Sequence, residues 1–134
     1  MIVDAALVVE WLIGLDATAK IDPIIGGEAL LAPSLIRVQV ANAFHNLMAR
    51  QVVGPAFRNA CLRRFQSLPM ELDDHAITQW HCLQRVIDLS DRNRLPIYSA
   101  RYLELAIRRS APIASFDAPL LQACRRERVE TVPV

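Results

Sequence analysis

The chain has 134 residues, a length that suits one domain with a single substantial core. An apolar fraction of 53% and a charged fraction of 22% are typical of a globular protein and unlike a disordered one. The net charge of +1 gives no bulk reason to expect a nucleic acid or membrane partner. Every basic residue except Lys20 is an arginine, which suits bidentate phosphate contacts, although arginine-rich codon usage explains the same bias.

The cysteines and the N-terminus favour a cytoplasmic protein. Cys61, Cys82 and Cys124 are an odd, widely spaced set without a CxxC pair, which disfavours a disulfide framework and a cysteine zinc site. We therefore expect buried free thiols in a reducing compartment. The first residues lack a basic stretch and Asp4 interrupts them, so we expect no signal peptide. No segment approaches the roughly 18–20 apolar residues that span a bilayer, so we expect no membrane contact.

Short apolar strands alternate along the chain with amphipathic helices. The predicted strands are residues 1–3, 29–32, 70–72, 113–116 and 129–132. The predicted helices are residues 5–13, 16–27, 34–53, 55–67, 73–89, 98–109 and 118–126. Asp16, Ser34 and Asp73 are the expected caps of three of these helices, and residues 91–94 are expected to form a polar loop.

This alternation predicts βαβ units and a mostly parallel sheet that helices cover on both faces. In such sheets ligands bind beyond the carboxyl ends of the strands, at the topological switch point. Asp4 and Asp117 each follow a predicted strand directly, which makes them the leading candidates for a site. Capping of the following helix is the alternative role for both side chains.

Several chemistries are disfavoured by missing motifs. Lys20 lies too early for a phosphotransfer receiver, Asp4 is not part of a DxD pair, and no phosphate-binding loop or GxSxG motif is present. His45, His75 and His81 do not cluster at a spacing that suits zinc. Metal-dependent phosphodiester chemistry remains, because Mg²⁺ accepts one or two carboxylates together with water and phosphate.

Three stretches carry a family resemblance: MIVDAALVVEWL, LLAPSLIRVQVANAF and LPIYSARYLELAIRRSAPIASFDAPLLQA. Over nearly the full length, residues 1–134, the sequence resembles a single PIN domain of the VapC toxin type. The resemblance implies a three-layer α/β/α sandwich around a parallel sheet of about five strands. It also implies a Mg²⁺- or Mn²⁺-dependent endoribonuclease that acts on RNA, forms a homodimer and is neutralised by a cognate antitoxin.

The resemblance assigns site residues one at a time. Asp4 and Asp117 match the first and last family acids and would hold the metal. Gln39 and Ser99 stand where the family has Glu and Asp, so two of the four acids are replaced. Ser115 and Asn42 match polar positions that support the site. Because an amide or a hydroxyl is a poorer ligand than a carboxylate for a hard cation, we expect weak metal binding without substrate.

The sequence leaves several roles open. Glu10, Asp91 or Glu104 is a conceivable replacement ligand, although each is more simply a solvated surface acid. Ser99 also suits a helix cap. The resemblance therefore admits two functions, which are a ribonuclease with a reduced site and a catalytically degenerate PIN domain that binds RNA or protein.

Other polar and aromatic residues also have two interpretations. Trp11 and Trp80 are expected to be core or interface anchors rather than platforms for base stacking. The arginines at 108–109 and 125–128 suit either RNA phosphate or the negative end of a helix dipole.

Overall fold

A computed structural model describes residues 1–14 and 18–134. Its parallel strands are β1 (Ile2–Val3), β2 (Leu30–Pro33), β3 (Met70–Asp73) and β4 (Ile113–Ala114). Its helices are α1 (Ala5–Ile13), α2 (Thr18–Gly27), α3 (Ile36–Ala49), α4 (Pro55–Gln66), α5 (His75–Thr78), α6 (Trp80–Asn93), α7 (Ile97–Arg109) and α8 (Ala118–Arg126). Asp16, the predicted cap of α2, lies outside the described residues.

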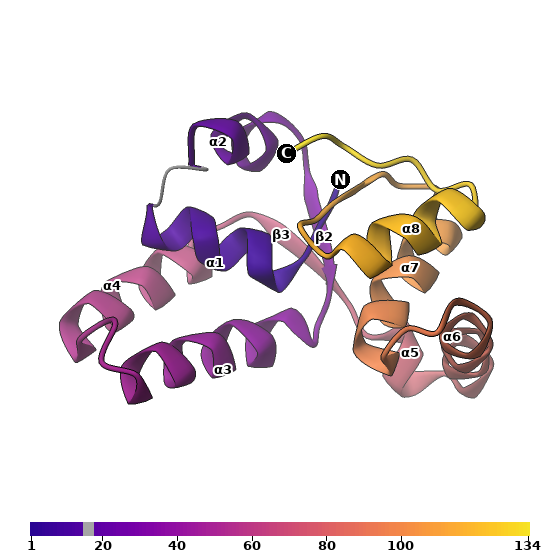
Figure 1. Ribbon diagram of the computed structural model, residues 1–134, viewed down its shortest axis with the longest axis horizontal. Helices are drawn as coiled ribbons and strands as arrows, with labels where there is room; N and C mark the ends of the chain where they lie inside the picture. The colour runs from indigo at the N-terminus through magenta and orange to yellow at the C-terminus, as the bar shows by residue number, and fades with distance from the viewer. Residues whose placement is uncertain (15–17) are drawn as a thin grey trace.

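The sheet is the middle of three layers, as predicted. Its strand order is β3-β2-β1-β4, with Ile2 paired in register with Leu31 on one side and Ile113 on the other. Figure 1 shows α1, α3 and α4 on one side of the sheet and α6, α7 and α8 on the other. The strand order turns back at β1 and β4, so the switch point lies between their carboxyl ends.

The predicted five-strand sheet is wrong in number, because four strands form in the part of the chain that the structure describes. The predicted strand at 129–132 is reduced to one parallel bridge between Ile113 and Thr131. Ile113 donates to Glu130 O at 3.0 Å and accepts from Val132 N at 2.8 Å. The terminal segment therefore covers the open edge of β4 without extending the ladder.

Three helix boundaries also differ from the predictions. Asp73 belongs to β3, and the helix predicted from it is divided at Gln79, which is extended (φ −124°, ψ 115°). Residues 91–93 of the predicted loop are instead the last turn of α6, and Arg94 follows the helix as its C-cap in a left-handed conformation (φ 53°). Ser34 is not the cap of α3, since Leu35 precedes the helix and makes no side-chain cap.

The core lies on both faces of the sheet and reaches all round α7. Residues 100–106 of that helix are buried without interruption, because α6, α8 and β2 pack against it. Phe44 of α3 and Leu7 of α1 are among the largest fully buried side chains on the other face. The three cysteines are free and buried, as predicted. No helix among the described residues is long and apolar enough to cross a membrane.

The two tryptophans differ sharply in exposure. Trp11 is 7% exposed; its Nε1 donates to Asp22 at 2.7 Å and the Arg64 guanidinium lies 3.8 Å from its ring centroid. Trp80 is 70% exposed, so it is not a core residue, and the alternative that it anchors an interface stays a prediction.

Candidate functional site

The two candidate carboxylates begin the helices that follow adjacent strands. Asp4 precedes α1 in an extended conformation and its Oδ1 accepts from the Leu7 amide at 2.8 Å. Asp117 precedes α8 and its Oδ1 accepts from the Leu120 amide at 3.3 Å. Capping and membership of one site therefore coexist, because β1 and β4 are neighbours and both strands end at the switch point.

A chain of hydrogen bonds joins four of the predicted site residues. The Ser99 hydroxyl at the start of α7 donates to Asp117 Oδ2 at 3.3 Å. The Asp117 amide donates to Ser115 Oγ at 2.9 Å, and that hydroxyl in turn donates to Asp4 Oδ2. Segments that are more than a hundred residues apart thus meet at one point, with fully buried Ser115 at its centre.

The environment of Asp4 disfavours its charged form. Burial raises the pKa of the Asp4 carboxyl, and the negative charges of Asp117 and Glu10 raise it further. Hydrogen bonds from Ser115 and from the Leu7 amide oppose that shift. A cation placed between Asp4 and Asp117 would relieve the repulsion between their charges.

Gln39 of α3 joins this site through a residue that the sequence did not single out. Its Oε1 accepts from the Tyr102 hydroxyl at 2.7 Å. Burial raises the pKa of Tyr102 well above its usual value, and the charge of Asp4 adds to that shift, so the phenol stays protonated and donates. Tyr102 follows Ser99 by three residues on α7, a spacing that puts both on neighbouring positions of one helix face.

The remaining predicted residues lie elsewhere. Asn42 is exposed on α3 and has no recorded side-chain hydrogen bond within the described residues. Asp91 is exposed on the last turn of α6 rather than in a loop. Glu10 is half-buried on α1, and its negative charge raises the pKa of Asp4.

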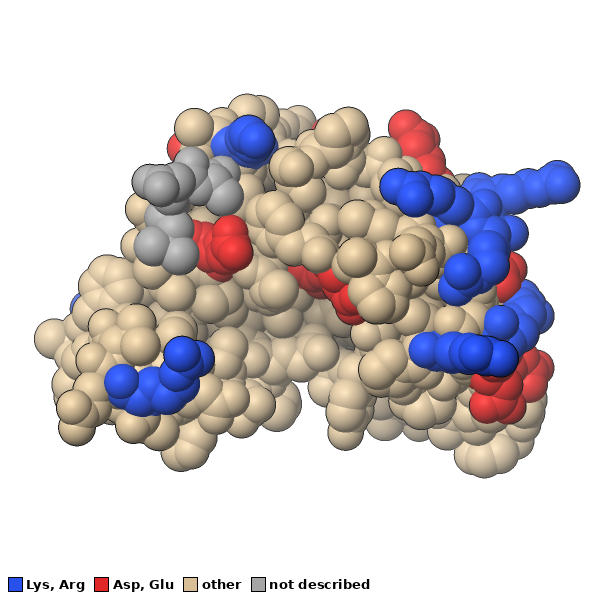
Figure 2. Space-filling model, viewed as in Figure 1, with Lys and Arg blue, Asp and Glu red and all other residues tan. Residues whose placement is uncertain are grey.

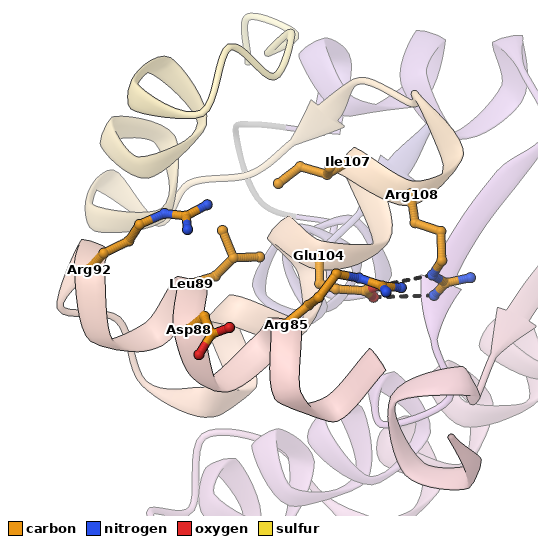
Figure 3. Close-up of a pocket in the computed structure, with 7 residues that line it drawn as sticks. All are labelled: Arg85, Asp88, Leu89, Arg92, Glu104, Ile107 and Arg108. Atoms are coloured by element: carbon orange, nitrogen blue, oxygen red, sulfur yellow. Dashed lines mark hydrogen bonds and ion pairs between the residues drawn. The ribbon is translucent and has the colours of Figure 1, made fainter. Parts of the chain in front are cut away.

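Glu104 belongs to a separate cluster of charges and not to the surface, contrary to expectation. It is 2% exposed and accepts from Arg85 at 3.2 Å and from Arg108 at 2.9 Å. Figure 3 shows its carboxylate between these two arginines, at one end of a cavity of about 360 Å³ between α6 and α7. Its two partners already neutralise it, so it is not a replacement ligand.

The same cluster extends to the end of β3. Arg108 donates from both terminal nitrogens to Asp73, at 2.9 and 2.8 Å. Asp73 also accepts from the His75 amide at 3.1 Å and its Oδ2 lies 2.9 Å from His75 Nδ1, so the last residue of the strand holds the first residue of α5. Burial would raise the pKa of Asp73, but the hydrogen bonds and the charge of Arg108 outweigh it and lower the pKa to about 2.

The carboxyl ends of the strands open into a hollow. Figure 2 shows acidic side chains in its wall at the centre of the view, between the part formed by α3 and α4 and the part formed by α5 and α6. Tyr98 and Phe116, the neighbours of Ser99 and Asp117 in the chain, are 61% and 38% exposed. The arrangement brings together two carboxylates, an amide and several hydroxyls. Gln39, Ser99 and Asp117 are half-buried, whereas Asp4, Ser115 and Tyr102 are buried.

Among solved structures, the fold is similar to the crystal structure of PAE2754 from Pyrobaculum aerophilum. The TM-score is 0.65 and the sequences are 20% identical, over 91% of this chain and 84% of that chain. At this identity the likeness concerns the fold alone. No protein-family model matches the chain, and no curated protein does.

Proposed function

We propose that the chain is a PIN-like ribonuclease of the VapC type, a Mg²⁺-dependent endoribonuclease with an acidic site reduced to two carboxylates. The observation that carries this proposal is the hydrogen-bonded chain from Ser99 through Asp117 and Ser115 to Asp4. It supports the assignment because motifs that are distant in the sequence, and that the family resemblance names together, converge at the switch point.

The donor set suits a magnesium ion that binds together with its substrate. Mg²⁺ commonly uses one or two carboxylates and completes its shell with water and substrate phosphates. Asp4 and Asp117 would hold it, since a carboxylate that accepts hydrogen bonds still has lone pairs available. When bound, the ion would activate a water molecule and neutralise the charge that develops on the phosphate.

The neutral residues would position groups around that ion. Ser99 fixes one oxygen of Asp117, and Ser115 fixes one oxygen of Asp4. The Gln39 carbonyl is held by Tyr102, which leaves its Nε2 without a recorded partner in the described chain. That amide can donate to a water molecule or to a phosphate oxygen, a role that does not require the lost negative charge.

Cleavage of a labelled single-stranded RNA in Mg²⁺ or Mn²⁺ tests the proposal. We expect cleavage that EDTA stops and that Asp4→Asn abolishes. Asp91→Asn is the matched control, because it makes the same chemical change at an exposed position of α6. Cleavage that survives in Asp4→Asn would contradict the placement of the site.

A second test restores the family acids. The double change Gln39→Glu and Ser99→Asp should strengthen metal binding, so Mn²⁺ should raise the melting temperature of the variant more than that of the native chain. A melting temperature that is indifferent to Mn²⁺ in the variant would show that the four positions do not form a metal site.

The alternative is a catalytically degenerate PIN domain that binds RNA, an antitoxin-like protein or a second copy of itself without cleavage. The observation that favours it is that no group of three or more His, Cys, Asp or Glu residues in the described ranges could hold a metal. It predicts RNA binding without cleavage, and no stabilisation of the native chain by millimolar Mg²⁺.

A further inference from the structure

Another pocket, separate from the cavity beside Glu104, lies between the end of α6 and one face of α8. It encloses about 410 Å³, and the residues that line it include three arginines and no acid: Arg92, Asn93, Arg94, Pro119, Gln122 and Arg126. Figure 2 shows basic side chains gathered on this side of the molecule, over α6 and α8, with some acidic side chains beside them; all of the basic ones are arginines, since Lys20, the one lysine, belongs to α2. The chemistry of the lining suits an anion.

Buried Asn93 and half-buried Glu127 orient two of these guanidinium groups. Asn93 is 7% exposed. Its side-chain Oδ1 accepts from Arg126 Nε at 2.9 Å, and its backbone carbonyl oxygen accepts from Arg126 Nη2 at 3.3 Å. Arg92 donates to Glu127 from Nε at 2.7 Å and from Nη2 at 3.0 Å. In both arginines Nη1 has no recorded hydrogen bond within the described residues, so an oriented donor remains for a ligand.

The third arginine, Arg94, has no hydrogen-bonded or ion-paired acid among the residues that the structure describes. Arg94 follows α6 as its C-cap in the left-handed conformation and is exposed, and no side-chain hydrogen bond or ion pair is recorded for it across residues 1–14 and 18–134. Glu127 is the one carboxylate hydrogen-bonded to a pocket arginine in that part of the chain. The charge of Asp88 also acts on Arg92, so three cations stand against two acids and the pocket keeps an excess of positive charge.

Two arginines near the end of α7 are already paired with acids. Arg108 pairs with Asp73 and Glu104, and Arg109 pairs with Glu71. The sequence suggested two arginine clusters, at 108–109 and 125–128, as phosphate contacts. The cluster at 125–128 contributes Arg126 to this pocket, and the cluster at 108–109 contributes no residue to its lining.

The pocket continues from the candidate site along a single helix. Asp117 caps α8, and Pro119 and Gln122 line the pocket on the way to Arg126. Arg126 follows Asp117 by nine residues, which is about 13 Å along the helix axis. A nucleic acid strand with one phosphate at the carboxylates would therefore bring a further phosphate within reach of the arginines.

We propose that this pocket is a subsite for the backbone phosphates of the RNA strand, beside the phosphate at the reaction centre. Guanidinium forks bind phosphate oxygens with charge-assisted hydrogen bonds, and such contacts position a strand without reading its sequence. This inference rests on the proposed ribonuclease function. It adds a place where the chain holds the substrate away from the carboxylates.

The test measures binding separately from cleavage. The full chain is titrated against a fluorescein-labelled oligouridylate in EDTA at several KCl concentrations, and affinity is followed by fluorescence anisotropy. The logarithm of the binding constant falls with the logarithm of salt, and each lost phosphate contact on a single strand lowers that slope by about 0.7. We expect this decrease for Arg94→Gln and for Arg126→Gln, and about twice as much for the double variant.

Arg125→Gln is the matched control, because it removes the same charge from the adjacent exposed position of α8 but does not line the pocket. It should keep the native slope. Arg94→Gln guards against a folding artefact, since Arg94 is exposed and no hydrogen bond or ion pair of its side chain is recorded in the described structure. A native slope in Arg94→Gln, or an equal loss in Arg125→Gln, would overturn the proposal.

The outcomes separate this inference from the function on which it rests. A changed slope in a chain that does not cut RNA supports the pocket and refutes the nuclease. Cleavage with an unchanged slope supports the nuclease and refutes the pocket. If polyglutamate binds in a salt-dependent way that Arg94→Gln weakens while the RNA does not bind, the pocket serves an acidic protein and the proposal is overturned.

Discussion

Replacement of Arg108 by alanine should destabilise the fold far more than the same change at Arg109. The two arginines are neighbours near the end of α7, and each forms an ion pair with an acid of β3. The Arg108 side chain is 20% exposed and its partners Asp73 and Glu104 are 5% and 2% exposed. The Arg109 pair is 38% and 59% exposed, so water screens it.

The size of the effect follows from what the change leaves behind. Arg108→Ala removes the main partner of Asp73 and one of two arginines that bind Glu104, so two buried carboxylates lose compensation. Removing one partner of a buried pair costs about 3–5 kcal/mol, and Arg85 still binds Glu104, so we expect about 3 kcal/mol. The lowered pKa of Asp73, about 2 against an ordinary 3.8, corresponds to about 2 kcal/mol of this.

Urea unfolding at pH 7, followed by circular dichroism, measures the difference between the two variants. The contribution of Asp73 is fully present above its unfolded pKa near 4 and is lost as the pH falls through about 2. The loss of stability in Arg108→Ala should therefore shrink between pH 4 and pH 2. An equal loss in both variants at pH 7, or one that does not depend on acid, would refute the role of the buried network.

Three further results are expected. Arg101→Met should stabilise the chain by about 1–3 kcal/mol in the same assay, because Arg101 is 7% exposed and its Nε and Nη2 are buried without a partner in the described structure; destabilisation would reveal a hidden partner. Iodide should quench most of the tryptophan emission of the native chain and little of it in Trp80→Phe, since Trp11 is buried; unchanged quenching in that variant would contradict the exposure of Trp80. Cys124 should react with Ellman's reagent after unfolding alone, because it is fully buried and burial raises its pKa to about 11; rapid reaction in the folded chain would contradict this.

Local pattern was enough to predict the layers of the fold. Apolar runs that end at Asp4 and near Asp117 indicated strands, and helical periodicity indicated most of the helices between them. The break at Gln79 was not predictable, because its neighbours continue a helical pattern and the chain turns there for tertiary reasons. The sequence pattern at 129–132 predicts a strand, but this segment pairs with β4 through one bridge alone. The extent of pairing depends on the neighbouring strand, so the local sequence does not predict it.

The sequence was enough to select candidate residues that belong to a recognisable motif. It was not enough to predict contacts between residues that lie far apart in the chain. Hydrogen bonds join Asp4, Ser99, Ser115 and Asp117, and their role as a functional site stays a prediction. Tyr102 lies at a helical spacing from apolar Leu105 and Ala106, so the sequence gives no sign of its hydroxyl bond to Gln39. The network around Arg108 was missed as well, because it joins residues that are 35 positions apart.

The continuous burial of residues 100–106 has a consequence for how the molecule opens. Helix α7 begins at the candidate site with Ser99 and Tyr102 and ends at the charge network with Arg108. Amides on this helix should exchange with deuterium by global unfolding alone, because no partial opening frees the helix from α6, α8 and β2 together. The site and the network would then be lost in a single cooperative event, although they lie at opposite ends of the helix.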